Sequence, residues 1–263
     1  MILPEIDPIA LQVGPIAIRW YGLSWLAAFG LIYFLANLRL KIISKDQLSD
    51  LMFYSLLGAI IGGRAGYMIF YNIDQLLNNP LSIFFIWQGG LSFHGGLLGV
   101  LISVAILVRF WNKNFLDIMD VMAPCVPVGL GCVRIGNFLN SELLGRPTDL
   151  SWGVIFPSDP LGLLRHPSQI YQALFEGIIL FIFILWFARK KRRKGYISAT
   201  FLISYGVIRC FTEIFREPDS HIGFDLFGFL TRGQLLSIPM IVAGIMLLFY
   251  SYNRSKKKNE TVS

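Results

Sequence analysis

Long apolar runs, separated by short polar or basic stretches, make up most of this chain. Seven of them are long enough to cross a hydrocarbon core about 30 Å thick as helices. They cover roughly residues 17–38, 51–71, 93–111, 115–135, 168–188, 196–215 and 233–252. The third, fourth and sixth runs contain several polar residues, so their ends are the least sharply defined. The pattern predicts an all-α polytopic membrane protein with seven transmembrane helices, and residues 1–263 as a single integral-membrane domain.

The composition agrees with this prediction. The chain has 263 residues, 55% of them hydrophobic, and a mean hydropathy of +0.61. Soluble globular domains are much less apolar, so the composition excludes that class. The first eight residues lack the positive charges and the small-residue cleavage site of a signal peptide, so we expect no cleaved leader.

Basic residues predict the orientation of the helices. With seven spans, four groups of Lys and Arg fall on one side of the membrane. They are Arg39, Lys41 and Lys45; Arg109 and Lys113; the run 189–194; and Arg254 with Lys256, Lys257 and Lys258. These groups hold 15 of the 23 basic residues, an excess that marks the cytoplasmic side. We therefore expect an extracytoplasmic N-terminus and a cytoplasmic C-terminus. The net charge of +7 is a topology signal, suited to membrane lipid headgroups, and does not indicate nucleic-acid binding.

Two local compositions indicate how the helices are connected and packed. The segment of about 139–167 is rich in Pro, Gly and Asp, and on the predicted topology it forms a small extracytoplasmic cap. In the second run, Gly58, Gly62 and Gly66 recur every four residues. Such a stripe lets another helix approach closely, and packing alone is its simplest interpretation.

Polar residues interrupt the fourth run. A charged side chain near the bilayer centre costs roughly 2.5–3.5 kcal/mol, so Arg134 requires a function or a partner there. Arg134 and Asn137 share a helical face if the helix continues that far, and Asn140 and Glu142 follow just beyond. So many polar groups beside glycines favour an oxyanion or phosphate site. The alternative is a structural ion pair between Arg134 and Glu142.

A second polar stripe lies on the sixth run. Its members, at spacings of four, four and three, are Tyr205, Arg209, Glu213 and Arg216. Because such a stripe cannot face lipid, it is predicted to face the protein interior. The functional hypothesis is a guanidinium held by a carboxylate and aimed at a phosphate. The alternative is a purely structural pair between Arg209 and Glu213.

Other candidates are weaker. His94 lies in Gly-Gly-Leu-Ser-Phe-His-Gly-Gly, where the glycines suggest a tight backbone and open access. A lone histidine is more often structural, and this is the simplest interpretation of both His94 and His166. Tyr21 fits an interfacial aromatic at the start of the first run. The cysteines lie in apolar segments, where buried thiols are the simplest interpretation. The sequence has no metal-ligand spacing and no glycine-rich phosphate loop, so we expect no metal and no cofactor.

One motif connects these residues to a family. Residues 131–145, GCVRIGNFLNSELLG, resemble the pattern Gly-x-x-Arg-x-Gly-Asn-Phe-x-Asn-x-Glu-x-x-Gly of bacterial prolipoprotein diacylglyceryl transferases, and match every fixed position. Further similar segments occur in family order: WYGL at 20–23, GGRAGY at 62–67, GGLSFHGG at 89–96, RHPSQIY at 165–171, YGVIR at 205–209, FREPD at 215–219 and GQLLSIPM at 233–240. The resemblance covers residues of about 5–250.

The resemblance implies a reaction. Members of this family move the diacylglyceryl group of phosphatidylglycerol to the thiol of the lipobox cysteine in a prolipoprotein signal peptide, in the bacterial inner membrane. A thioether forms and glycerol phosphate leaves. The family's catalytic and lipid-binding positions correspond to His94, Arg134, Arg209, Tyr21, Tyr205, Glu213, Asn137, Asn140, Glu142 and Gly145.

General chemistry is compatible with this reaction. A thiol must become a thiolate to attack carbon, and arginines can stabilise an anionic phosphate leaving group. His94 is the candidate base because imidazole titrates near neutral pH; lipid- or arginine-assisted deprotonation is the alternative.

Two other functional classes compete with the transferase. A transporter or binding protein for anionic solutes would also use intramembrane arginines, but the chain shows no internal repeat. An intramembrane hydrolase would need a Gly-x-Ser-x-Gly elbow, which the sequence lacks, or a pair of aspartates well inside the spans. Asp117 and Asp120 lie near the cytoplasmic end of the fourth run, far from the polar outer cluster.

Overall fold

The computed structural model describes residues 1–14, 16–39, 42–218 and 230–260. Two assignments made from the sequence, Lys41 in a basic group and Asp219 at the end of a matching segment, lie outside these residues. The chain forms two compact units, one of Met1–Leu35 with Met119–Ser263 and one of Ala36–Ile118.

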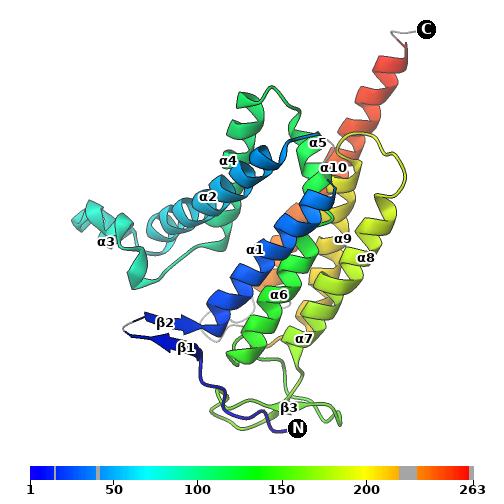
Figure 1. The fold of residues 1–263 in the computed structure, drawn as a ribbon. Coiled ribbons are helices and arrows are strands. Elements are labelled where there is room, and N and C mark those ends of the chain that lie inside the picture. The colour runs from blue at the N-terminus through cyan, green and yellow to red at the C-terminus, as the bar shows by residue number, and fades with distance from the viewer. Residues whose placement is uncertain (15, 40–41, 219–229, 261–263) are drawn as a thin grey trace. The chain divides into compact units, whose positions relative to one another are not determined.

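Helices build most of the first unit. They are α1 (Trp20–Leu38, whose last residues enter the second unit), α5 (Phe115–Met122, which crosses the boundary), α6 (Val126–Leu139), α7 (Ser168–Gln172), η3 (Ala173–Ile179), α8 (Leu180–Phe187), α9 (Tyr196–Thr212), η4 (Glu213–Phe215) and α10 (Arg232–Glu260). Segments α7, η3 and α8 form one continuous helix, in which η3 is a π-helix. This helix packs against both α6 and α9, and α10 packs on α9 (Figure 1).

Small and apolar residues hold these helices together. Leu180 and Ile184 of α8 are fully buried and form a cluster with Tyr205 of α9. Where α6 crosses the π-helix, a Cβ atom on Gly177 would lie 2.8 Å from the Cα atom of Gly131. Only glycine fits at such a crossing, because any side chain would force the two backbones apart.

The helix predicted over residues 115–135 is broken. Helices α5 and α6 meet at an angle of 49°, separated by residues 123–125. Pro124 and Pro127 lie at this break. Proline has no N–H to donate and its ring clashes with the preceding turn, so a continuous helix is disfavoured there. Helix α6 then continues to Leu139, four residues beyond the predicted end.

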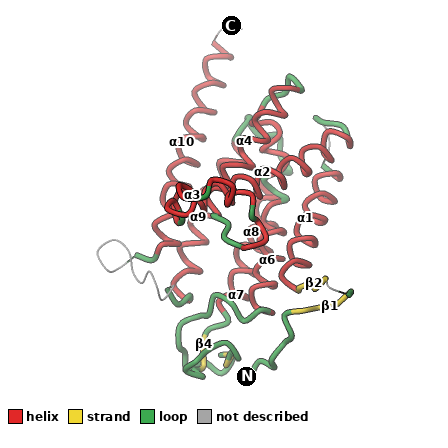
Figure 2. Tube along the Cα trace, turned by 90° about the vertical axis from the view of Figure 1, so that its left-hand side faces the viewer, coloured by secondary structure: helices red, strands yellow, loops and turns green. Residues whose placement is uncertain are grey.

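Two short β-hairpins correct the all-α prediction. Strands β1 (Ile9–Val13) and β2 (Ile16–Arg19) are antiparallel, so the first helix begins at Trp20 instead of residue 17. Strands β3 (Val154–Ile155) and β4 (Leu164–Arg165) form the second hairpin inside the cap, residues 139–167. The N-terminal segment extends this hairpin through hydrogen bonds between residues 1–3 and Ile155. Figure 2 shows the strands at one end of the helices of the first unit.

The second unit consists mainly of two tightly packed helices. They are α2 (Lys45–Tyr71) and α4 (Phe93–Phe110), joined by α3 (Ile73–Asn78), η1 (Pro80–Phe84) and η2 (Ile86–Gln88). Added Cβ atoms on Gly58, Gly62 or Gly66 would overlap the backbone of Gly95 or Gly99 on α4. The glycine stripe is therefore a close-packing surface, as predicted.

Five helices are long and apolar enough to cross a membrane, or up to six if α5 and α6 count as one bent span. They match predicted runs one, two, five, six and seven, and the bent pair matches run four. Run three corresponds to α4, whose apolar part is shorter than the others. The protein is thus a mostly helical, multi-pass membrane protein.

Candidate functional site

Two arginines from different helices converge on one carboxylate. Nη2 of Arg134, on α6, lies 3.4 Å from Oε2 of Glu176. Nη1 of Arg209, on α9, lies 3.2 Å from Oε1 of the same side chain. Each carboxylate oxygen therefore faces one guanidinium. The structure brings together Arg134 and Arg209, as the hypothesis of a common anion site requires.

Glu176 occupies the centre of the π-helix. Its side chain is completely buried, and Oε1 also accepts a hydrogen bond of 2.7 Å from the hydroxyl of Thr212. A π-helix is rare and occurs frequently at functional sites, because its wider turn reorients side chains relative to a regular helix. Buried carboxylates are retained when they are paired, and here two guanidiniums and a hydroxyl provide that pairing.

The interactions continue along α9. Nη2 of Arg209 lies 2.6 Å from Oε2 of Glu213, and Nη1 of Arg216 lies 3.6 Å from Oε1 of Glu213. We call Arg134, Glu176, Arg209, Glu213 and Arg216 the ion-pair network. The Arg209–Glu213 pair considered in the sequence analysis is therefore present, but Arg209 also reaches Glu176.

The polar stripe of α9 faces the interior, as predicted. Tyr205, Arg209 and Glu213 are all buried. The Tyr205 phenol interacts with Glu176, Arg209 and Arg134, which places it beside the two arginines. The site thus combines side chains from three helices that pack against one another: α6, the π-helix η3 and α9.

The turn after α6 carries the remaining motif residues. Nδ2 of Asn137 and Nδ2 of Asn140 donate to the two carboxylate oxygens of Glu142, at 3.1 and 3.2 Å. The carboxylate beside Arg134 is therefore Glu176, and the proposed Arg134–Glu142 pair is wrong. The reason is geometric: Glu142 lies past the helix end and closes back onto Asn137 within the turn. Ser141 and Leu143 adopt positive φ values of 52° and 57° to make this turn.

The cap holds this turn in place. A Cβ atom on Gly145 would overlap the carbonyl oxygen of His166, so glycine is needed where the two segments meet. Arg165 donates to the carbonyl of Gly145 at 3.0 Å, and Nε of Arg146 donates to the carbonyl of Arg216 at 3.0 Å. Burial lowers the pKa of His166, whose ring lies 3.3 Å from the Tyr171 hydroxyl, which supports a structural role for this histidine.

Tyr21 lies at the start of α1, next to the motif. A Cβ atom on Gly136 would overlap the hydroxyl of Ser24 and lie 3.5 Å from the ring of Tyr21. The absence of a side chain at Gly136 thus lets α1 approach α6 two residues after Arg134. Tyr21 also packs edge-to-face on Trp25.

His94 and Arg64 belong to the second unit. His94 is exposed at the start of α4, which is capped by the hydroxyl of Ser92. The Arg64 guanidinium is buried and donates to carbonyl oxygens of the segment 82–90. Arg64 thus holds the loop before α4, a structural role that explains a buried arginine without an anionic ligand.

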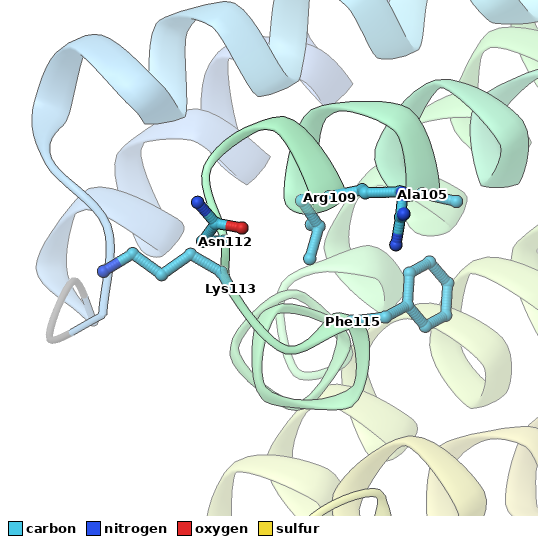
Figure 3. Close-up of a pocket in the computed structure, with 6 residues that line it drawn as sticks. Ala105, Arg109, Asn112, Lys113 and Phe115 are labelled. Carbon is cyan, nitrogen blue, oxygen red and sulfur yellow. The ribbon is translucent and has the colours of Figure 1, made fainter.

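A pocket of about 370 Å³ also lies in the second unit. It is lined by Ala105, Val108, Arg109, Asn112, Lys113 and Phe115. In the close-up, the Lys113 ammonium and the Arg109 guanidinium point in opposite directions (Figure 3). Two cations that diverge do not form a joint anion site, so this pocket is a weaker candidate than the arginine pair.

Several buried polar atoms near the arginines are not used by the protein itself. Within the described residues, Oδ1 of Asn137 and both amide atoms of Gln172 have no hydrogen-bond partner. Asn137 lies one turn after Arg134, and Gln172 lies four residues before Glu176. Buried polar atoms normally have partners, so these amides can serve a polar ligand.

Cysteine and metal chemistry receive no support from the geometry. All three cysteines are thiols; Cys125 is buried, and Cys132 and Cys210 are half-buried. Over the described ranges, no three His, Cys, Asp or Glu side chains cluster in a way that could hold a metal ion.

Glu176 and Thr212 are not among the site residues predicted from the sequence. The available signal was the carboxylate itself, since Glu176 is an acidic residue inside an apolar run and requires a positive partner there. Its partners are 42 and 33 residues away along the chain, so spacing within one helix could not reveal them.

The sequence is similar to one protein family over almost its whole length. A family described as prolipoprotein diacylglyceryl transferase matches residues 8–250. A phosphatidylglycerol–prolipoprotein diacylglyceryl transferase of Acinetobacter baylyi is 47% identical over 257 residues, covering 95% of this chain and 94% of the relative. The protein of the same name from Teredinibacter turnerae is 48% identical over 263 residues, covering 95% and 92%. The family match includes the whole ion-pair network and the motif turn.

Proposed function

The chain belongs to the prolipoprotein diacylglyceryl transferase family, and on this premise we propose that it transfers the diacylglyceryl group of phosphatidylglycerol to the lipobox cysteine of a prolipoprotein. The thiol sulfur forms a bond to the terminal glyceryl carbon. The bond from that carbon to the phosphate oxygen breaks, and its electron pair leaves with glycerol phosphate. The thiol gives its proton to a base. This is the first step of lipoprotein maturation.

One observation carries the assignment of the site: the convergence of Arg134 and Arg209 on Glu176. Two guanidiniums at one point, shielded from water, form a site for a single anionic group. The phosphodiester of phosphatidylglycerol is such a group, and its negative charge increases on the leaving oxygen during transfer. Guanidiniums aimed at that charge stabilise the transition state more than the ground state.

We assign roles to the other residues on the same basis. Glu213 holds Arg209 by its short contact, and Tyr205 provides a phenol beside both arginines. The turn of Asn137, Asn140, Glu142 and Gly145 forms one wall of the lipid site. The unused Oδ1 of Asn137 and the unused amide group of Gln172 fit the hydroxyl groups of the glycerol headgroup, which need both donors and acceptors.

His94 is our candidate for the base that accepts the thiol proton. Imidazole is the side chain whose unperturbed pKa is best matched to that task near neutral pH. His94 is exposed at the start of α4, so its imidazole is open to a substrate. Deprotonation assisted by an arginine or by lipid is the alternative, and a His94→Gln variant separates the two.

For the membrane arrangement we propose seven spans, with α4 and the bent pair α5–α6 each crossing once. The N-terminus and the cap then lie outside the cytoplasm, and the basic loop 189–194 lies inside. The charge distribution supports this orientation. We further propose that both units act as one transferase domain in the bacterial inner membrane, in contact with phosphatidylglycerol and the prolipoprotein signal peptide.

The direct test uses purified protein, phosphatidylglycerol vesicles and a synthetic lipobox peptide. Mass measurement should show a peptide heavier by one diacylglyceryl group, together with released glycerol phosphate. A peptide with serine in place of the lipobox cysteine is the matched control and should not react. Failure of the cysteine peptide to gain mass, with folded protein, would overturn the proposed function.

A further inference from the structure

We infer that Glu176 is a positioning residue for the phosphate site, an inference that rests on the proposed transfer reaction. Glu176 holds the guanidiniums of Arg134 and Arg209 at one point when no lipid is bound. The phosphate then takes over as their common partner. Glu176 is thus both the organiser of the site and the internal competitor of the substrate.

The positioning part follows from where Glu176 lies. Its Oε2 faces Arg134 on α6 and its Oε1 faces Arg209 on α9, so one side chain bridges two helices from a third. Two guanidiniums repel each other strongly where water is scarce. A completely buried carboxylate between them removes that repulsion and fixes their separation.

The competing part follows from the contact distances. Charge-assisted hydrogen bonds between nitrogen and oxygen are typically about 2.7–2.9 Å long. Glu176 contacts Arg134 at 3.4 Å and Arg209 at 3.2 Å, both longer than this range. Arg209 makes its short contact, 2.6 Å, with Glu213. The bonds to Glu176 are therefore loose enough to exchange for bonds to a phosphate oxygen.

The two arginines are not equivalent in this exchange. Thr212 donates to Oε1 at 2.7 Å, so the oxygen that faces Arg209 is anchored. Oε2 has Arg134 as its partner, at 3.4 Å, which is longer than the 3.2 Å between Oε1 and Arg209. Arg209 also keeps Glu213 as a second carboxylate. We therefore assign Arg134 as the arginine that turns from Glu176 to the phosphate, while Arg209 stays in place.

The test compares Glu176→Gln with wild type in two assays. The first is kcat for transfer from phosphatidylglycerol to the lipobox peptide, and the second is inhibition by glycerol phosphate. The amide keeps the size of the side chain but presents N–H groups to a guanidinium. We expect kcat to fall by about 10²-fold, the usual effect of disturbing an oxyanion-stabilising donor. Glycerol phosphate should inhibit several-fold more strongly, because the competing carboxylate is gone.

A purely structural role predicts a different pair of results. It would lower the unfolding temperature and leave inhibition by glycerol phosphate unchanged or weaker in the folded fraction. Glu217→Gln is the control, since this carboxylate is half exposed and contacts only the cap residue Arg165 among charged side chains of the described chain, at 3.6 Å. A near-normal kcat in Glu176→Gln overturns the positioning role, and weaker inhibition overturns the competition.

Thr212 provides a second, milder test if Glu176→Gln fails to fold. Thr212→Val keeps the shape of the side chain and removes its hydroxyl, whereas Thr212→Ser keeps the hydroxyl. We expect transfer to fall several-fold in the valine variant and to be largely recovered in the serine variant. Equal rates in the two variants overturn the inference. If wild type itself makes no thioether, the proposed function fails, and calorimetric binding of glycerol phosphate to wild type and Glu176→Gln still decides the role of Glu176.

Discussion

Asp159 and Arg165 form a two-pronged ion pair inside the cap. Nε of Arg165 donates to Oδ2 of Asp159 at 2.8 Å, and Nη2 donates to Oδ1 at 3.0 Å. The hydrogen bonds from Arg165 lower the pKa of Asp159 to about 2, against the effect of burial. The same arginine holds the carbonyl of Gly145, so this pair supports the turn that carries the motif residues.

This pair predicts an acid-sensitive cap. A carboxyl whose pKa is lower in the folded state stabilises that state above its ordinary pKa of 3.8, and the contribution is lost as the pH falls toward about 2. We expect amide protection in residues 139–167 to decrease between these pH values in wild type. Hydrogen exchange in detergent measures it. In Asp159→Asn this acid-dependent step should be absent, and in Asp149→Asn, at an exposed cap residue, it should persist.

Arg134 and Arg209 are predicted to act as one unit. Replacing either with alanine should reduce the transfer rate by about 10²–10³, because each removes a donor to the leaving phosphate. Lysine keeps the charge but loses the planar fork, so it should recover only part of the rate. The double alanine variant should be little worse than either single variant.

The measurement for this pair is the transfer rate of purified, folded variants at saturating lipid. Arg254→Ala, at an exposed position of α10, is the control for loss of an arginine and should behave as wild type. Near-normal rates in either site variant would return that arginine to a structural role in the ion-pair network.

The reacting thiol should come from the substrate. Cys125 is buried, Cys132 and Cys210 are half-buried, and all three lie in apolar segments, where cysteines usually serve packing. Replacing all three with alanine should leave the transfer rate within a few-fold of wild type, apart from packing losses. Complete loss of transfer in a folded triple variant would instead indicate an enzyme-bound intermediate.

The α2–α4 contact should tolerate no side chain at its centre. A Cβ atom on Gly62 would overlap the carbonyl of Gly95, so Gly62→Ala should destabilise the protein by about 1–3 kcal/mol, a typical cost of overpacking. Gly30 of α1 has open space around it, and Gly30→Ala should be neutral or stabilising by up to about 1 kcal/mol. Thermal unfolding in detergent compares the two. Equal stability of both variants would mean that α2 and α4 do not pack this closely.

The orientation in the membrane can be checked with reporters. A reporter that is active only in the cytoplasm should show activity when it is fused after Asn259, because the basic groups mark that side. The opposite result would place the motif turn and the cap on the cytoplasmic side, and would remove the basis for an extracytoplasmic site.

The positions of the helices could be predicted from the sequence better than the contacts between side chains of different helices. Hydropathy locates apolar helices because burying their backbone in lipid leaves few other options. The inward face of α9 followed from the cost of exposing Arg209 to lipid. The partner of Arg134 could not be derived in this way, since Glu142 is near in sequence and Glu176 is near only in the fold. The first hairpin had a visible signal, the Gly-Pro pair at residues 14–15 between two apolar stretches, and the second was too short to have one.

The π-helix at Ala173–Ile179 has a consequence for how this protein can change over time. Its hydrogen bonds skip one more residue than those of an α-helix, so it holds one residue that a regular helix would lack. Deleting a single residue there would let the segment close into a regular α-helix, which turns the side chains inside the segment to new directions. Glu176 would then leave the arginines, while Leu180 and Ile184 would keep their places in the Tyr205 cluster. Substitutions at the outward-facing Leu174 and Ile178, by contrast, touch neither. Evolution can therefore substitute residues in this segment far more easily than it can change the segment's length.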